Sequence, residues 1–220
     1  RVWLTQQART ADGIRIEIAA NIAHSVEAQA AFGNGAEGVG LFRTEMLYMD
    51  RTSAPGESEL YNIFCQALES ANGRSIIVRT MDIGGDKPVD YLNIPAEANP
   101  FLGYRAVRIY EEYASLFTTQ LRSILRASAH GSLKIPMISS MEEILWVKEK
   151  LAEAKQQLRN EHIPFDEKIQ LGIMLEVPSV MFIIDQCCEE IDFFSIGSND
   201  LTQYLLAVDR DNAKVTRHYN

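Results

Sequence analysis

The stretch that decides the fold is Ile191-Asp-Phe-Phe-Ser-Ile-Gly-Ser-Asn-Asp-Leu-Thr-Gln-Tyr204. Its first part, Ile191–Ile196, is an apolar run of the length and composition of a buried β-strand. A Gly-Ser turn follows, and Asn199 and Asp200 then stand where a helix should begin. One polar residue would suffice to cap that helix, so the pair also indicates chemistry at the carboxyl end of the strand.

The same alternation of strand and helix runs along the whole chain. Apolar runs rich in β-branched residues alternate with longer segments of helical periodicity, which predicts a parallel sheet joined by crossover helices. The predicted strands are Ile14–Ala20, Gly38–Phe42, Ser75–Arg79, Lys134–Ile138, Ile169–Glu176 and Ile191–Ile196. The predicted helices are His24–Phe32, Glu57–Ala71, Phe101–Glu112, Leu116–Ala129, Met141–Arg159 and Leu201–Ala207. This order fits an open doubly wound sheet, and it also fits a (β/α)8 barrel without its last two units.

The composition is that of an ordinary globular protein and excludes some classes of partner. Of 220 residues, 46% are hydrophobic and 23% are charged, which suits one large domain or two small ones. The net charge of −9 argues against nucleic acid or an anionic membrane as the main partner. A small anionic ligand is still allowed, because clustered arginines can reverse the sign of the potential locally.

Neither membrane insertion nor secretion is expected. No apolar run approaches the ~20 residues of a membrane span, and the polar N-terminal residues do not resemble a signal peptide. Cys65, Cys187 and Cys188 form an odd set without a CxxC spacing. We expect all three to be reduced and to lie on helices, in a cytoplasmic protein.

Charged side chains stand at the ends of four predicted strands. Arg43 follows the second strand, Arg79 ends the third, Glu176 ends the fifth and Asp200 follows the sixth. Carboxyl ends of parallel strands share one rim, so these side chains should converge. Mg²⁺ takes one or two carboxylates plus substrate oxygens, and arginine binds oxyanions with a bidentate fork. Each residue alone could be a surface ion pair or a helix cap, but together they indicate a site for a metal and an anion.

The third predicted strand is followed by a polar segment of unusual length, 82–100. It holds the pair Gly84-Gly85 and three prolines. Loops of this length inside compact domains usually serve a function, and we interpret this one as functional.

Four longer motifs occur in order along the chain. They are Gly35-Ala-Glu-Gly-Val-Gly-Leu-Phe-Arg-Thr-Glu45, Val78-Arg-Thr-Met-Asp-Ile-Gly-Gly-Asp-Lys87, Asn99-Pro-Phe-Leu-Gly-Tyr-Arg105 and Phe194-Ser-Ile-Gly-Ser-Asn-Asp-Leu-Thr-Gln-Tyr204. These motifs, in this order, resemble those of the phosphoenolpyruvate-utilising enzymes. The resemblance is nearest to Enzyme I of the bacterial phosphotransferase system, including the multiphosphoryl transfer proteins that contain it. Pyruvate phosphate dikinase and phosphoenolpyruvate synthase resemble the chain more distantly.

The resemblance implies a fold and a set of site residues. The fold would be the phosphoenolpyruvate-binding (β/α)8 barrel, with about six of its eight units within residues 1–220. Glu176 and Asp200 would be the Mg²⁺ ligands. The residues implied to hold the substrate are Arg43, Arg79 and Arg210 on the phosphoryl group, Asn199 and Asp200 as further substrate contacts, and Arg105 as another active-site arginine.

The resemblance also implies a reaction and partners. In the family, the phosphoryl group moves from phosphoenolpyruvate to a histidine on a separate domain and leaves pyruvate enolate. The phosphohistidine then passes the group to the carrier protein HPr, the first step of sugar uptake. The family further implies a homodimer.

Parts of the family pattern are missing from the sequence. The chain ends where strands seven and eight should begin, so the cysteine that protonates the enolate has no counterpart. The phosphorylated-histidine domain and the carrier-binding helices are also absent. We therefore expect a fragment that binds substrate without full turnover, with exposed edge strands that favour association.

The fourth predicted strand is two residues shorter than the family pattern, between Ile135 and Pro136. Either the protein has lost two residues there, or two residues are missing from the sequence at this point. We expect the second, a break in the chain with a Cα separation well above the ~3.8 Å of a trans peptide.

Two other functions compete with phosphoryl transfer. One is a Mg²⁺-dependent lyase or aldolase on a related barrel, against which the motif from Arg79 to Lys87 speaks. The other is a dimerisation or phosphoenolpyruvate-binding module without turnover, which the missing cysteine favours for this chain.

Overall fold

The centre of the molecule is a parallel β-sheet. A computed structural model describes residues 4, 6–127, 131–135 and 138–219. Within them, six strands pair in the order in which they follow each other along the chain. These strands are β3 (Ala19–Ile22), β4 (Gly38–Arg43), β5 (Ile76–Arg79), β6 (Gly131–Ile135), β7 (Leu171–Leu175) and β8 (Phe193–Ile196).

The sheet is open, so the expected barrel is not closed. Among the described strands, β3 and β8 are the two edges and do not pair with each other. A doubly wound sheet would reverse its strand order part-way along, and the observed order does not reverse. The domain is therefore an α/β domain with a sequentially ordered parallel sheet. The prediction of a break between Ile135 and Pro136 falls outside the described residues.

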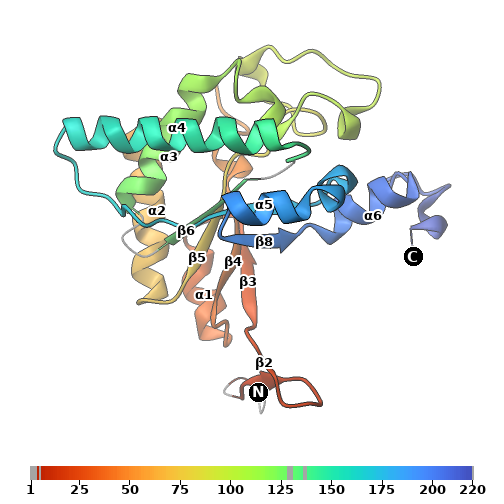
Figure 1. The fold of residues 1–220 in the computed structure, drawn as a ribbon, viewed down its shortest axis with the longest axis horizontal. Helices are drawn as coiled ribbons and strands as arrows, with labels where there is room; N and C mark the ends of the chain where they lie inside the picture. Colours follow the sequence, from red (N-terminus) through yellow and green to blue (C-terminus); the bar gives the residue numbers. More distant parts are fainter. Residues whose placement is uncertain (1–3, 5, 128–130, 136–137, 220) are drawn as a thin grey trace.

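The crossover helices cover the sheet. Figure 1 shows α2 and α3 beside the strands and α6 beyond the end of β8. Helix α2 packs against α1 and α3, and α4 packs against α3 and α5. The helices are α1 (Glu27–Gly33), α2 (Glu57–Ala71), α3 (Ala114–Ala127), α4 (Met141–Asn160), α5 (Ile184–Glu190) and α6 (Ser198–Leu206).

Local sequence accounts for the helices that were predicted best. In α2, Leu60, Phe64 and Ala67 are buried at helical spacing, and the helix ends at Asn72, which adopts the left-handed conformation with φ 48°. Helix α4 starts at a capping box, in which the Ser140 side chain accepts from the Glu143 backbone N–H. The predicted ranges of α2 and α4 match to within one residue.

Two predicted elements are wrong. The segment Phe101–Glu112 forms short 3₁₀ turns, Pro100–Leu102 and Ala106–Ile109, instead of a helix. Between them Arg105 is extended, because its backbone bridges to Gly84 and its side chain is drawn into the interior.

The predicted first strand, Ile14–Ala20, is divided in two. Its start, β2 (Arg15–Ile16), pairs with β1 (Ala8–Arg9) in a separate antiparallel hairpin, and the main sheet begins at β3.

The three cysteines are free thiols and lie on α2 and α5, as predicted. Among the described helices, none is long and apolar enough to cross a membrane.

The long segment after β5 folds back over the strand ends. Gly84 and Gly85 have φ of 88° and 58°, a region that suits glycine. A Cβ on Gly84 would lie 2.5 Å from the carbonyl oxygen of Tyr104. This close approach lets the segment 100–105 return across Gly84 and places Arg105 beside the end of β5.

Candidate active site

One cavity of about 310 Å³ gathers the carboxyl ends of four strands, β4, β5, β7 and β8. Arg43 lies opposite Arg79 in the β4–β5 register, so their side chains leave neighbouring strand ends. The cavity brings together every predicted site residue except Arg105, which is buried and does not line the cavity. Its charged and amide-bearing lining residues are Asn21, Arg43, Arg79, Asp82, Lys87, Glu176, Asn199, Asp200 and Arg210.

On one side of the cavity, a buried glutamate holds two arginines. The Glu45 Oε1 atom accepts from Arg79 Nη2 at 2.6 Å and from Arg43 Nε at 2.9 Å. Burial opposes ionisation of Glu45, but the charges of Arg79 and Lys87 lower the pKa of its carboxyl overall. The carboxylate is therefore charged, and it binds both guanidinium groups, the buried one of Arg79 and the more exposed one of Arg43.

Asp82 is a second buried anchor. Arg105 donates to both of its oxygens at 2.9 and 2.8 Å, and Lys87 Nζ donates at 2.7 Å. Burial by itself would raise the pKa of the Asp82 carboxyl, but Arg79, Lys87 and Arg105 hold it well below its usual range. We call Arg43, Glu45, Arg79, Asp82, Lys87 and Arg105 the arginine half of the site.

The arginine half has spare donors. Among the described residues, Arg79 Nε and Arg105 Nη1 are buried without a hydrogen-bond partner. A buried donor left unpaired costs about 1–3 kcal/mol, more when it is charged. The half also holds more cations than carboxylates. Both features suit an oxyanion that enters the cavity and accepts hydrogen bonds from guanidinium groups.

A neutral network braces the arginine half from α3. Gln120 is completely buried, and its Oε1 accepts from the Met81 backbone N–H at 2.9 Å. Its Nε2 donates to the Thr44 hydroxyl, which in turn donates to the Arg79 carbonyl at 2.7 Å. These hydrogen bonds join the ends of β4 and β5 to each other and to α3.

Across the cavity lie Glu176, Asn199, Asp200 and Arg210, which we call the carboxylate half. Arg210 Nη1 donates to Asp200 Oδ1 at 2.5 Å, and Arg105 Nη2 lies 3.7 Å from Asp200 Oδ2. Asp200 is thus the point at which the two halves meet. Asn199 is more exposed, and its Oδ1 accepts from the Tyr219 hydroxyl at 3.3 Å.

Glu176 fits against the turn that precedes α6. A Cβ on Gly197 would lie 2.6 Å from Glu176 Oε2 and 2.8 Å from its Cβ. Only a residue without a side chain leaves room for the carboxylate at this place. Because β7 and β8 are neighbours, the acids that follow them, Glu176 and Asp200, line the same wall.

These two carboxylates fit a hard divalent cation. No cluster of three or more His, Cys, Asp or Glu side chains that could hold a metal occurs among the described residues. A cation between Glu176 and Asp200 would therefore take its other ligands from water and substrate. Mg²⁺ is usually bound in this way, by one or two carboxylates plus substrate phosphate.

Sequence reasoning missed some of the residues that organise the cavity. Asp82 and Glu45 were visible beside the predicted arginines, but their role as buried anchors depends on contacts distant in sequence. Lys87 stands at the end of a motif quoted above, yet it was not assigned to the site. Gln120 gave no signal, because a single glutamine inside an amphipathic helix is ordinary.

Comparison with known protein families shows to which family the chain belongs. The family described as "PEP-utilising enzyme, PEP-binding domain", in which PEP is phosphoenolpyruvate, matches residues 1–220. The chain belongs to this family. The expected resemblance is thereby confirmed.

Similar proteins include two multiphosphoryl transfer proteins and a phosphoenolpyruvate-protein phosphotransferase. The chain is 99% identical to Multiphosphoryl transfer protein 2 of Escherichia coli (strain K12), which it matches over its full length. It is 60% identical to Multiphosphoryl transfer protein 1 of the same organism over 98% of the chain. It is 48% identical to the Phosphoenolpyruvate-protein phosphotransferase of Bacillus sp. (strain S) over 96% of the chain. The domain is homologous to part of these enzymes.

The PEP-binding domain spans only part of each relative. It covers 27% of Multiphosphoryl transfer protein 2 and 37% of the Bacillus phosphotransferase. The match to Multiphosphoryl transfer protein 2 extends over 222 residues, whereas the chain has 220. The difference of two residues equals the length of the shortening that we expected in the fourth strand. The match gives the size of this difference and not its position in the chain.

Proposed function

We propose that the cavity binds phosphoenolpyruvate together with Mg²⁺, and that the parent enzyme transfers the phosphoryl group to a histidine of a protein. The observation that carries this proposal is the pairing of two unlike halves. Arg79, whose buried Nε–H has no hydrogen-bond partner, lines the same cavity as the two carboxylates of Glu176 and Asp200. Phosphoenolpyruvate needs both, because it is a phosphate and carboxylate anion that Mg²⁺ can bridge.

The arginines would hold the phosphoryl group. Arg79 has little freedom because Glu45 fixes it, whereas Arg43 is 45% exposed in its side chain and can close on a ligand. Arg210 would exchange its bond to Asp200 for a bond to a phosphoryl oxygen. Arg105 would act as a further active-site arginine through its contacts with Asp82 and Asp200. Asn199 would contact the enolpyruvate part of the substrate.

Glu176 and Asp200 would hold Mg²⁺. When bound, Mg²⁺ supplies positive charge to the phosphate and carboxylate oxygens of the substrate. In the transfer, the bond from phosphorus to the enol oxygen breaks and a bond to the imidazole nitrogen forms. The electron pair stays on the enolate oxygen, and the arginines neutralise charge on the transferred oxygens.

The parent's wider role extends this proposal. Its acceptor histidine and HPr-binding surface would lie on other domains, and the six strands would form an arc of a (β/α)8 barrel. The exposed side chains of Phe182 and of Ile196, the latter on the edge strand β8, favour association, as in a homodimer. The free thiols suit a reducing compartment such as the cytoplasm.

Calorimetric titration of phosphoenolpyruvate into the chain, with and without Mg²⁺, tests the proposal. We expect binding that Mg²⁺ strengthens and that Asp200→Asn weakens at least tenfold, because one of two metal ligands is lost. The matched control is Asp185→Asn, which removes an exposed acid on α5. Absence of binding by the folded wild type would contradict the proposal.

A further inference from the structure

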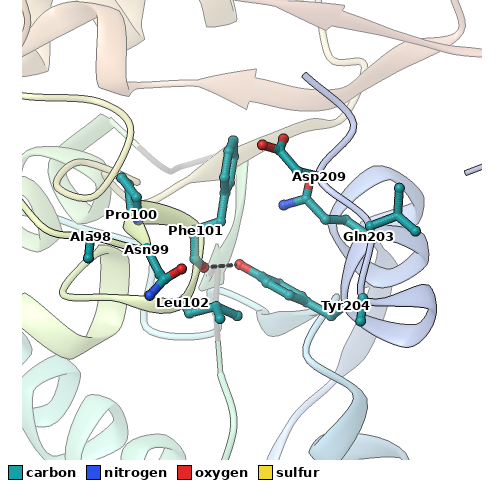
Figure 2. Close-up of a pocket in the computed structure, with 10 residues that line it drawn as sticks. Ala98, Asn99, Pro100, Phe101, Leu102, Gln203, Tyr204 and Asp209 are labelled. Carbon is teal, nitrogen blue, oxygen red and sulfur yellow. Dashed lines mark hydrogen bonds between the residues drawn. The ribbon is translucent and has the colours of Figure 1, made fainter. Parts of the chain in front are cut away.

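A second cavity, of about 330 Å³, lies between residues 98–102 and α6. Figure 2 shows the Tyr204 side chain reaching from α6 toward Phe101, with its hydroxyl directed at the carbonyl oxygen of Phe101 and the Phe101 ring pointing away from it. The hydroxyl donates a hydrogen bond to that oxygen. We call this pair of residues the clasp. It belongs to neither half of the site.

The clasp joins two segments that the sheet keeps apart. Residues 98–105 follow β5 and carry Arg105, whereas α6 follows β8 and carries Asp200. Strands β6 and β7 lie between β5 and β8, so no strand pairing ties these segments together. A direct contact above the sheet must therefore set the distance between them.

The ring of Phe101 lies against two arginines of the site. The guanidinium carbon of Arg210 is 5.5 Å from the ring centroid, and that of Arg105 is 6.0 Å away. Cations at this range are attracted to the negatively charged face of an aromatic ring. Gln203, the residue before Tyr204, also accepts from the Arg210 backbone N–H at 3.1 Å. One turn of α6 thus positions both the ring and the arginine.

We propose that Tyr204 is a positioning residue, whose hydroxyl holds Phe101 in the place where its ring orients Arg105 and Arg210. The cavity behind the clasp gives Phe101 room to leave that place once the hydrogen bond is lost. This inference rests on the proposed function only for its effect on ligand affinity.

The chemistry of Tyr204 suits a permanent donor. Burial, with smaller contributions from Asp200 and Glu176, raises the pKa of the Tyr204 hydroxyl to about 12 despite the nearby Arg105. The phenol therefore stays protonated at neutral pH. The clasp should not open by titration, and only a change of residue should remove it.

Side-chain NMR of the unliganded chain tests the clasp without any ligand. The Phe101 ring should shift the Nε–H signals of Arg105 and Arg210, and Tyr204→Phe should move both signals toward unshifted values. The matched control is Tyr113→Phe, which removes a similar phenol-to-carbonyl bond, to Leu92, outside the cavity. Unchanged arginine signals in Tyr204→Phe would overturn the proposal.

Titration with phosphoenolpyruvate and Mg²⁺ gives the second readout. We expect the Kd of Tyr204→Phe to rise about threefold to fivefold, since a smaller fraction of molecules has both arginines in place. Tyr113→Phe should lower the melting temperature comparably and leave the Kd unchanged. In a Phe101→Leu background, Tyr204→Phe should add no further loss, and additive losses would overturn the clasp. If the wild type binds nothing, the proposed function fails, while the NMR comparison still decides the role of Tyr204.

Discussion

The arginine half and the carboxylate half of the site are built in different ways. In the arginine half, Glu45 and Asp82 are almost completely buried, and each binds more than one cation. In the carboxylate half, Asp200 pairs with the partly exposed Arg210, and Asn199 bonds Tyr219 near the surface. The first is a fixed frame, whereas the second is held by contacts that a ligand can replace.

The difference shows where pre-organisation matters. A buried charge that loses its partner is expensive, so the frame cannot rearrange when an anion arrives. Electrostatic stabilisation works best when the donors are already in place before the charge develops. Under the proposed function, the carboxylate half would instead exchange the Arg210 contact of Asp200 for Mg²⁺. The same type of substitution should therefore act on stability in one half and on binding in the other.

Asp82→Asn and Asp200→Asn should show the largest contrast. Asp82→Asn leaves Arg79, Lys87 and Arg105 without their shared carboxylate, and we expect a loss of about 3–5 kcal/mol in the free energy of unfolding. Asp200→Asn keeps an oxygen that accepts from Arg210, so we expect about 1 kcal/mol. Urea denaturation measures both. Equal losses would mean that the halves are not different in kind.

The pH dependence of unfolding should reveal the same frame. The pKa values of Asp82 and Glu45 lie below their ordinary values of 3.8 and 4.5 in the folded protein. Groups of this kind stabilise the fold above the unfolded pKa, so the stability should decline as the pH falls from about 5.

Denaturation between pH 7 and pH 3 checks this sign. Asp82→Asn should flatten the decline, because one of the two almost completely buried carboxyl groups with a lowered pKa is gone. A decline of the same steepness in the variant would place its source elsewhere.

A smaller effect is expected from Gly197→Ala. The backbone of Gly197 has φ −84°, which alanine tolerates, so the cost is the contact between the new Cβ and Glu176. Overpacking of this kind costs about 1–3 kcal/mol. The displaced carboxylate should also reduce the effect of Mg²⁺ on ligand affinity. Gly56→Ala is the control, because nothing lies within 4 Å of its Cβ. Equal behaviour of the two variants would remove the argument for Gly197.

The sequence was sufficient for the strand-end residues and insufficient for what holds them. Parallel strands bring their carboxyl ends to one rim, so Arg43, Arg79, Glu176 and Asp200 could be placed together from their positions alone. The anchoring role of Asp82 depends on Arg105, 23 residues away along the chain. No local pattern encodes that pairing.

The same long-range pairing explains the wrong helix at Phe101–Glu112. Its periodicity favours a helix, but burying the Arg105 side chain against Asp82 and bridging its backbone to Gly84 require an extended residue. Tertiary contacts therefore override local preference. The family resemblance implied an incomplete barrel of about six units. A barrel closes only when its first and last strands pair, and here the edge strands β3 and β8 do not pair.

The most direct test of the two-part site is calorimetry on Glu176→Gln, in which the affinity for phosphoenolpyruvate is measured with and without Mg²⁺ and compared with the affinity for inorganic phosphate. We expect that Mg²⁺ no longer raises the affinity of this variant for phosphoenolpyruvate, while phosphate, held by the arginine half, still binds as in the wild type. A variant that keeps the full Mg²⁺ effect, or that loses phosphate and phosphoenolpyruvate equally, would contradict the division of the site into a fixed anion frame and a metal-binding wall.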